Sequence, residues 1–285
     1  MVVLTLSTAP LLRAEQEAQL VITQARPTGQ AADHPGSVTT QSPQDPSALF
    51  RVSPSTANVP ATFSFFVAVV DQFGRIIPNS DITIVYDPVA NSGGHQHHDA
   101  SRPKGRYDPE SGNTGSDGFL PVTYTAPEVS GLIFTVFTCQ TPTGVPCRPA
   151  FGNVDVSIDL IAASCGTQVG QKAAHPSNNH ALPSLQAACT SALSDYTARY
   201  PGSTLTYNDM SLQWGGLFDC GANTPPCPGG AAWQPPHAGH RWGDNADFEH
   251  DFVPVSRRRV LRDVIENAGF RIHDEGNHWH LTVLN

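Results

Sequence analysis

Five side chains near the C-terminal end of the sequence could form a metal site with an acid beside it. His240 and Asp247 lie in the stretch HAGHRWGDNADF, and Glu275, His278 and His280 lie in the later stretch DEGNHWHLTV. Imidazole nitrogens and carboxylate oxygens are common zinc ligands, and three protein ligands leave the fourth tetrahedral position for water. Zinc lowers the pKa of such a water to about 7, so a nearby carboxylate can take its proton. The combination predicts hydrolytic chemistry.

The spacing of these residues indicates how they could converge. His278 and His280 alternate along an extended segment, so they share one face of a strand. His240 and Asp247 are separated by six residues, which is too wide for one helical turn and predicts a strand–turn–strand ribbon whose ends approach. A third ligand from the last strand completes a His/Asp/His set, and Glu275 is the candidate general base.

The segments around these residues predict an α+β unit. HALPSLQAACTSALSDYTARY has apolar residues at helical spacing, which predicts a helix near 183–199. SRRRVLRDVIENAGFRI predicts a second helix, with Ser256 as its N-cap and Gly269 at its end. TLTYNDMSLQWGGLFD predicts a strand followed by a Gly-Gly turn, and HWHLTVL predicts a short final strand.

The preceding part of the chain, from Leu49 to about Leu160, has the pattern of short β-strands. In DITIVYDP, Ile82, Ile84 and Tyr86 alternate with Thr83, Val85 and Asp87, as on a strand that buries one face. Several such segments are bounded by Gly, Pro or Asn. This pattern is typical of an antiparallel sandwich of the immunoglobulin type.

The N-terminal part of the sequence leaves more than one interpretation open. MVVLTLSTAPLLRA is either the remnant of a signal peptide or a disordered tail. Residues 15–24 could form a first strand, and residues 25–47 have the composition of a loop or linker. The predicted organisation is 1–47 for these segments, 48–162 for the sandwich and 163–285 for the α+β unit.

The six cysteines suggest an oxidising compartment. None forms a C-x-x-C pair, which argues against a cysteine zinc ribbon. Two pairs flank short Pro/Gly turns, and elimination leaves the third; the preferred disulfides are Cys139–Cys147, Cys220–Cys227 and Cys165–Cys189. An even cysteine count in a turn-rich chain predicts a secreted, periplasmic or cell-surface protein, whereas buried free thiols in a cytosolic protein are the alternative.

Charge and hydropathy narrow the class of partner. The formal net charge of −9 argues against non-specific binding to nucleic acid or to an anionic membrane surface. No apolar stretch reaches the length of a transmembrane helix, so no integral membrane segment is expected. Nothing in the sequence indicates an oligomeric state.

A second group of histidines lies in the predicted sandwich, in the loop NSGGHQHHDASRPKG. His95, His97 and His98 are followed by Asp99, and alternate residues of an extended chain share a face. The loop is either a second metal contact, a flap over the C-terminal site or a solvated polar loop. A metal-carrying role would require more than one metal ion per chain.

The C-terminal motifs resemble those of a known enzyme superfamily. H-x-x-G-x-x-x-D followed by E-x-x-H-x-H is similar to the pattern of zinc peptidases that include lysostaphin-type enzymes, D-Ala-D-Ala peptidases, penicillin-insensitive murein endopeptidases and the hedgehog signalling domain. The resemblance covers roughly residues 165–285. It implies that His240, Asp247 and His280 bind zinc, that Glu275 is the general base, and that His278 stabilises the transition state without binding the metal.

The resemblances together predict a secreted, two-domain, zinc-dependent amide hydrolase with one Zn²⁺ per chain. The segment DQFGRIIPNSDITI and the following GSDGFLPVTYTAPEVSGLIFTV resemble bacterial Ig-like modules, which implies a spacer or binding module. The peptidase resemblance implies peptidoglycan peptides, or another peptide, as the substrate. The alternative is a non-catalytic cell-surface or matrix protein that retains a zinc site. The hedgehog branch of the superfamily keeps the zinc ligands but is known for binding and not for catalysis.

Overall fold

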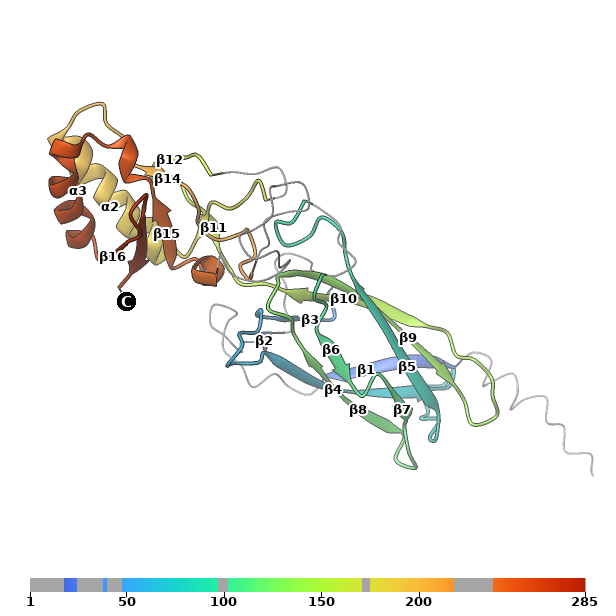
Figure 1. The fold of residues 1–285 in the computed structure, drawn as a ribbon. Coiled ribbons are helices and arrows are strands. Elements are labelled where there is room, and N and C mark those ends of the chain that lie inside the picture. Colours follow the sequence, from blue (N-terminus) through green and yellow to red (C-terminus); the bar gives the residue numbers. More distant parts are fainter. Residues whose placement is uncertain are drawn as a thin grey trace, which may run out of the picture.

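The computed structural model describes residues 18–24, 38–39, 48–96, 102–170, 175–217 and 238–284. Across these ranges the chain is mostly β-sheet with two α-helices (Figure 1). The first sheet has the strand order β1 (Gln19–Gln24), β4 (Thr62–Val70), β8 (Phe119–Thr125), β6 (Arg106–Asp108). The second has the order β2 (Val38–Thr39), β3 (Phe50–Val52), β10 (Ala150–Val156), β9 (Gly131–Gln140), β5 (Asp81–Pro88), β7 (Ser111–Asn113).

The two N-terminal sheets share one hydrophobic core. The predicted alternation on β5 is confirmed, because Ile82, Ile84 and Tyr86 are buried while the residues between them are exposed. The core is rich in aromatic rings from both sheets; Phe50 of β3 stacks on Phe63 of β4 with the ring centroids 4.1 Å apart. Each sheet buries one face against the other, as in a sandwich.

The expectation of a purely antiparallel arrangement was wrong at one pair of strands. β3 and β10 are parallel, with Val154 opposite Phe50. The strands between them in sequence cross from one sheet to the other, and such a crossover, unlike a hairpin, can return a strand in the same direction. Val38–Thr39, inside the predicted linker, pairs with β3 as β2.

Buried phenols predict how the N-terminal core responds to alkali. Burial raises the pKa of Tyr107 and of Tyr124 above the ordinary value of 10. A raised pKa in the folded state means that folding is favoured while the phenols are protonated, so stability is complete below pH 10 and falls above it. Above pH 10 we expect the free energy of unfolding to fall by up to ~1.4 kcal/mol per pH unit for each phenol that stays protonated in the folded state. Urea unfolding at pH 8, 10 and 11 measures this slope; Tyr107→Phe should lower it, and an unchanged slope would contradict the prediction.

The C-terminal part consists of a second β-region with helices on one face. Its five-stranded sheet has the order β12 (Thr167–Gln168), β14 (Thr206–Tyr207), β15 (Asn245–Phe248), β17 (Trp279–Val283), β16 (Phe270–Asp274). A two-stranded ribbon pairs β11 (Ile161–Ala162) with β13 (His180–Ala181). The helical elements are α2 (Pro183–Arg199), α3 (Val255–Asn267), and the 3-10 turns η1 (Ala238–Trp242) and η2 (His250–Phe252).

The helix predictions hold, with one correction. α2 spans the predicted residues, and α3 ends where Gly269 adopts a positive φ of 96°. Ser256 is not the N-cap of α3, because Pro254 occupies that position and Ser256 already lies in the first turn of the helix. In the predicted strand near 204–214, Thr206–Tyr207 alone form β14. β16 was not predicted as a separate strand.

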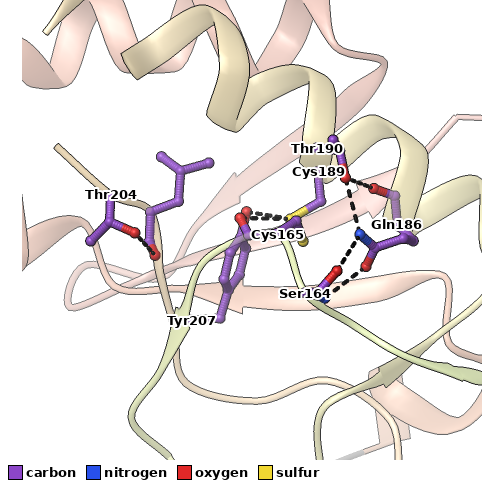
Figure 2. The surroundings of a disulfide bond; sticks show 8 residues. Ser164, Cys165, Gln186, Cys189, Thr190, Thr204 and Tyr207 are labelled. Carbon is purple, nitrogen blue, oxygen red and sulfur yellow. Dashed lines mark hydrogen bonds between the residues drawn. A yellow bond between two sulfur atoms is a disulfide. The ribbon is translucent and has the colours of Figure 1, made fainter. Parts of the chain in front are cut away.

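Two of the predicted disulfides are present. Cys139–Cys147 closes the turn between β9 and β10, and Cys165–Cys189 ties the segment before β12 to α2. Figure 2 shows the hydroxyl of Tyr207 directed at the second disulfide, 2.7 Å from Cys189 Sγ. A disulfide sulfur has no hydrogen, so Tyr207 is the donor. The predicted pair Cys220–Cys227 lies outside the described residues, as do residues 1–17.

The described helices lack the properties of a membrane-spanning segment. Neither α2 nor α3 combines the length and the apolar character that crossing a membrane requires.

Candidate metal centre

The alternation of two neighbouring strands places Asp247 and His280 on the same face of the sheet. Ala246 and Phe248 of β15, like Trp279 and Leu281 of β17, are buried in the core that α2 and α3 cover. Side chains between them point to the opposite face. Asp247 and His280 are direct cross-strand partners, and Asp247 Oδ1 lies 2.8 Å from His280 Nδ1. The core pattern therefore fixes two of the predicted ligands side by side.

His240 reaches this face from η1 and not from a strand. The predicted strand–turn–strand ribbon is thus wrong in its first arm, which is a single 3-10 turn, but its ends do approach. His240 Nε2 lies 3.1 Å from Asp247 Oδ2. One ligand atom from each of His240, Asp247 and His280 lies within 4.8 Å of the others, and no other such group of three or more occurs in the described ranges.

The donor set suits a divalent metal ion. Two imidazoles and one carboxylate are the ligand types of catalytic zinc sites that keep an open position. The distances between ligand atoms show that these three residues could hold a metal ion. Zinc is the metal that the sequence resemblance implies.

The electrostatics of the cluster favour a charged carboxylate. Burial raises the pKa of Asp247, but hydrogen bonds from His240 and His280 and positive charge on His240 and His278 outweigh this effect and hold the pKa well below its usual range. Burial lowers the pKa of His240, and the hydrogen bond and charge of Asp247 outweigh that effect and raise it. Asp247 is therefore ionised and ready to act as an anionic ligand at neutral pH.

Glu275 and His278 lie at the rim of the cluster. His278 Nε2 is 3.3 Å from Glu275 Oε2 and 3.5 Å from Asp247 Oδ2. Exposure increases outward, since the His240 side chain is 3% exposed and that of Glu275 is 43% exposed. The structure thus brings all five predicted residues together and places the predicted acid on the solvent side. His278 directly precedes β17 and shares the side of His280, as the alternation predicted.

The N-terminal sheets brace η1 through an ion pair. Arg241, next to His240, contacts Glu128, which lies between β8 and β9. The sequence gives no local signal for this partner, because Arg241 and Glu128 are 113 positions apart in the chain. Gly216 lies between the two parts: its N–H donates to Arg241 O, and a Cβ on it would come within 2.7 Å of Ser130 N. The position of His240 therefore depends on contacts with the N-terminal part of the chain.

Sequence reasoning missed the residue that contacts both histidine ligands. A carboxylate or carbonyl commonly fixes the outer nitrogen of a metal-binding imidazole, but the nearby carboxylate of Asp274 accepts from Trp279 Nε1 and from Gly276 N–H. Asn245 performs this role, with Oδ1 3.2 Å from His280 Nε2. The available signal was its position two residues before Asp247, which puts both side chains on one face of β15.

The histidine loop of the N-terminal part does not contribute to this cluster among the described residues. His95 is buried, and its ring packs edge-on against His175 with centroids 5.3 Å apart. His97, His98 and Asp99 lie outside the described residues, as does His237. The hypothesis of a second metal contact or a flap therefore stays a prediction.

Gly239 provides a test of how tightly His280 is held. A Cβ on Gly239 would lie 2.8 Å from His280 Cε1 and 3.1 Å from its Nε2, which is closer than carbon and ring atoms pack. Gly239→Ala should push the imidazole off Asp247 and weaken zinc binding by about 10–100-fold, as when a supporting contact of a ligand is lost. Competition with a fluorescent chelator measures this, and an unchanged dissociation constant would show that the ring can shift freely.

Comparisons with known proteins add no family assignment. A scan of protein-family models finds no match to this chain, and a search of curated protein sequences finds none either.

Proposed function

We propose that this protein is a secreted zinc-dependent amide hydrolase, with an N-terminal immunoglobulin-like sandwich and a C-terminal domain of the hedgehog/D-Ala-D-Ala-peptidase type. The observation that carries the proposal is the convergence of His240, Asp247 and His280 within 4.8 Å, with Glu275 and His278 at the exposed rim. A purely structural metal site does not need a spare acid on its open side. The two disulfides fit an oxidising compartment.

The five residues of the site have three different roles in the proposed reaction. His240, Asp247 and His280 would hold the ion; when bound, zinc supplies Lewis acidity and an acidified water. Glu275 Oε2 takes the proton of the attacking water and returns it to the leaving nitrogen. His278 Nε2, 3.3 Å from that carboxylate, donates a hydrogen bond to the oxyanion that develops on the carbonyl. Because Glu275 is the more exposed of the two, the substrate approaches from its side.

The substrate class comes from the resemblance of the motifs, which implies peptidoglycan cross-links or stem peptides. The test is digestion of muropeptides with the native protein and with Glu275→Gln, followed by separation of the products. Glu266→Gln is a matched control, since Glu266 is an exposed glutamate on α3 that pairs with Arg262. We expect product from the native protein and from the control, and a loss on the order of 10²–10⁴-fold for Glu275→Gln.

Each other outcome of this digestion has a distinct meaning. Equal product from native protein and Glu275→Gln would remove the role of Glu275 as the base. No product from a zinc-loaded native protein would remove the substrate assignment. Zinc binding without turnover of any peptide substrate would favour the alternative, a non-catalytic cell-surface or matrix protein that keeps the site.

A further inference from the structure

We propose that the solvent-facing side of the six-stranded N-terminal sheet binds a second copy of this chain. The side chains concerned lie on β5, β9 and β10, which are direct neighbours in that sheet (Figure 1). Val85 is 55% exposed, Phe134 is 43% exposed and Phe151 is 69% exposed. Single exposed apolar residues are common on protein surfaces, but a contiguous group of them marks a site of interaction.

The apolar side chains form a continuous row across the three strands. Val136 on β9 is the direct cross-strand partner of Val85 on β5 and of Phe151 on β10. Phe134 lies two positions from Val136 on the same face of β9, and its ring centroid is 6.3 Å from that of Phe151. Because direct cross-strand partners have their Cβ atoms ~5 Å apart, these four side chains present one apolar surface to the solvent.

The order of side-chain sizes along the row fits a second copy of the same row. The large side chain of Phe151 lies at one end, Val136 lies in the centre, and the small side chain of Val85 lies at the other end. A two-fold axis parallel to β9 and above Val136 places Phe151 of one copy over Val85 of the other. Large residues then face small residues, which is how two packed layers fill the space between them. Such a contact uses the same surface on both copies and closes at a dimer.

The same two-fold axis gives a charged residue beside the row a suitable partner. Asp87 and Asn153 are the direct cross-strand partners of Phe134, one on each side of it. In the proposed dimer Asp87 of one copy faces Asn153 of the other, and an amide NH₂ group can donate to a carboxylate. Asp87 therefore does not face its own copy. This matters because each chain has a formal net charge of −9, which opposes association through charged faces.

The first test is the oligomeric state of the native chain in solution. A face of this size predicts weak association, so sedimentation velocity should cover ~10 μM to ~1 mM. We expect an equilibrium between monomer and dimer. Phe134→Ser should raise the dissociation constant by at least about 10-fold, as for an aromatic residue at the centre of an interface. A native chain that stays monomeric over the whole range would overturn the proposal.

Phe66→Ser is the matched control for Phe134→Ser. Phe66 is also 43% exposed and also contacts a second phenylalanine, Phe119, with the ring centroids 6.2 Å apart, but it lies on β4 of the other N-terminal sheet. We expect its dissociation constant to equal that of the native chain. Equal losses in both variants would show that association does not use the proposed face. If the row only stabilises its own sheet by cross-strand packing, Phe134→Ser would lower the free energy of unfolding without changing the oligomeric state, which would also overturn the proposal.

Thiol cross-linking tests how the two copies are arranged. Packed sheets lie ~10 Å apart, so a short thiol-specific cross-linker can join positions that face each other. Val136→Cys should give a cross-linked dimer, because the two-fold axis brings this position of both copies together. Val85→Cys alone and Phe151→Cys alone should stay uncross-linked, like the native chain, whereas a mixture of the two variants should cross-link. Cross-linking of Val85→Cys alone, or none in the mixture, would overturn the proposed dimer.

Discussion

Asp247→Asn is expected to lower the affinity for Zn²⁺ by on the order of 10³-fold or more, well beyond the ~10–100-fold that loss of a supporting contact costs. Asp247 lies in the middle of the cluster, with carboxylate oxygens facing His240, His278 and His280. It supplies the one negative charge among the three ligands, and its low pKa keeps that charge at neutral pH. An asparagine keeps the size of the side chain and removes the charge.

Zinc affinity by chelator competition, together with metal content after dialysis, measures the effect of Asp247→Asn. Asp263→Asn is the matched control, because Asp263 is an exposed aspartate on α3, and its affinity should equal that of the native protein. Zinc bound by Asp247→Asn as tightly as by the native chain would mean that the ion binds elsewhere. The His95 loop would then become the first alternative to examine.

The parts of this site that the sequence could predict are those that depend on local periodicity. The alternation around Asp247 and His280 follows from the apolar residues between them, so their shared face required no knowledge of the remaining chain. The helix at 183–199 and the Cys165–Cys189 pair were likewise readable from spacing and elimination.

The parts that could not be predicted depend on contacts distant in sequence. The conformation around His240 follows from Arg241 meeting Glu128 and from Gly216 packed between the two parts of the chain. The role of Asn245 depends on the orientation of one amide, which is set by Gly239 and Thr282. Neither set of contacts follows a sequence period; the alternation of β15 could place Asn245 on the face of Asp247, but it could not predict these partners.

Loss of Cys165–Cys189 is expected to be the largest single change in stability of the C-terminal core. The disulfide closes a loop with a sequence separation of 24. Restricting the unfolded chain by a loop of that length stabilises the folded state by ~3.5 kcal/mol. Cys139–Cys147 has a separation of 8, for which the same relation gives ~2.5 kcal/mol. Backbone pairing also closes the shorter loop, since Cys147 N–H donates to Cys139 O at 3.0 Å, so its disulfide should contribute even less.

Tryptophan fluorescence can assign these losses to the correct core. All four tryptophans occur after residue 163, and Trp279 packs against Phe248 in the core that contains Cys165 and Cys189. In guanidinium unfolding, Cys165→Ala/Cys189→Ala should move the fluorescence transition to lower denaturant. Cys139→Ala/Cys147→Ala should leave that transition in place and lower the stability seen by far-UV circular dichroism. A shift of the fluorescence transition by the second double variant would show that the two cores unfold as one unit, and the ion pair between Glu128 and Arg241 would be the first contact to test as the link.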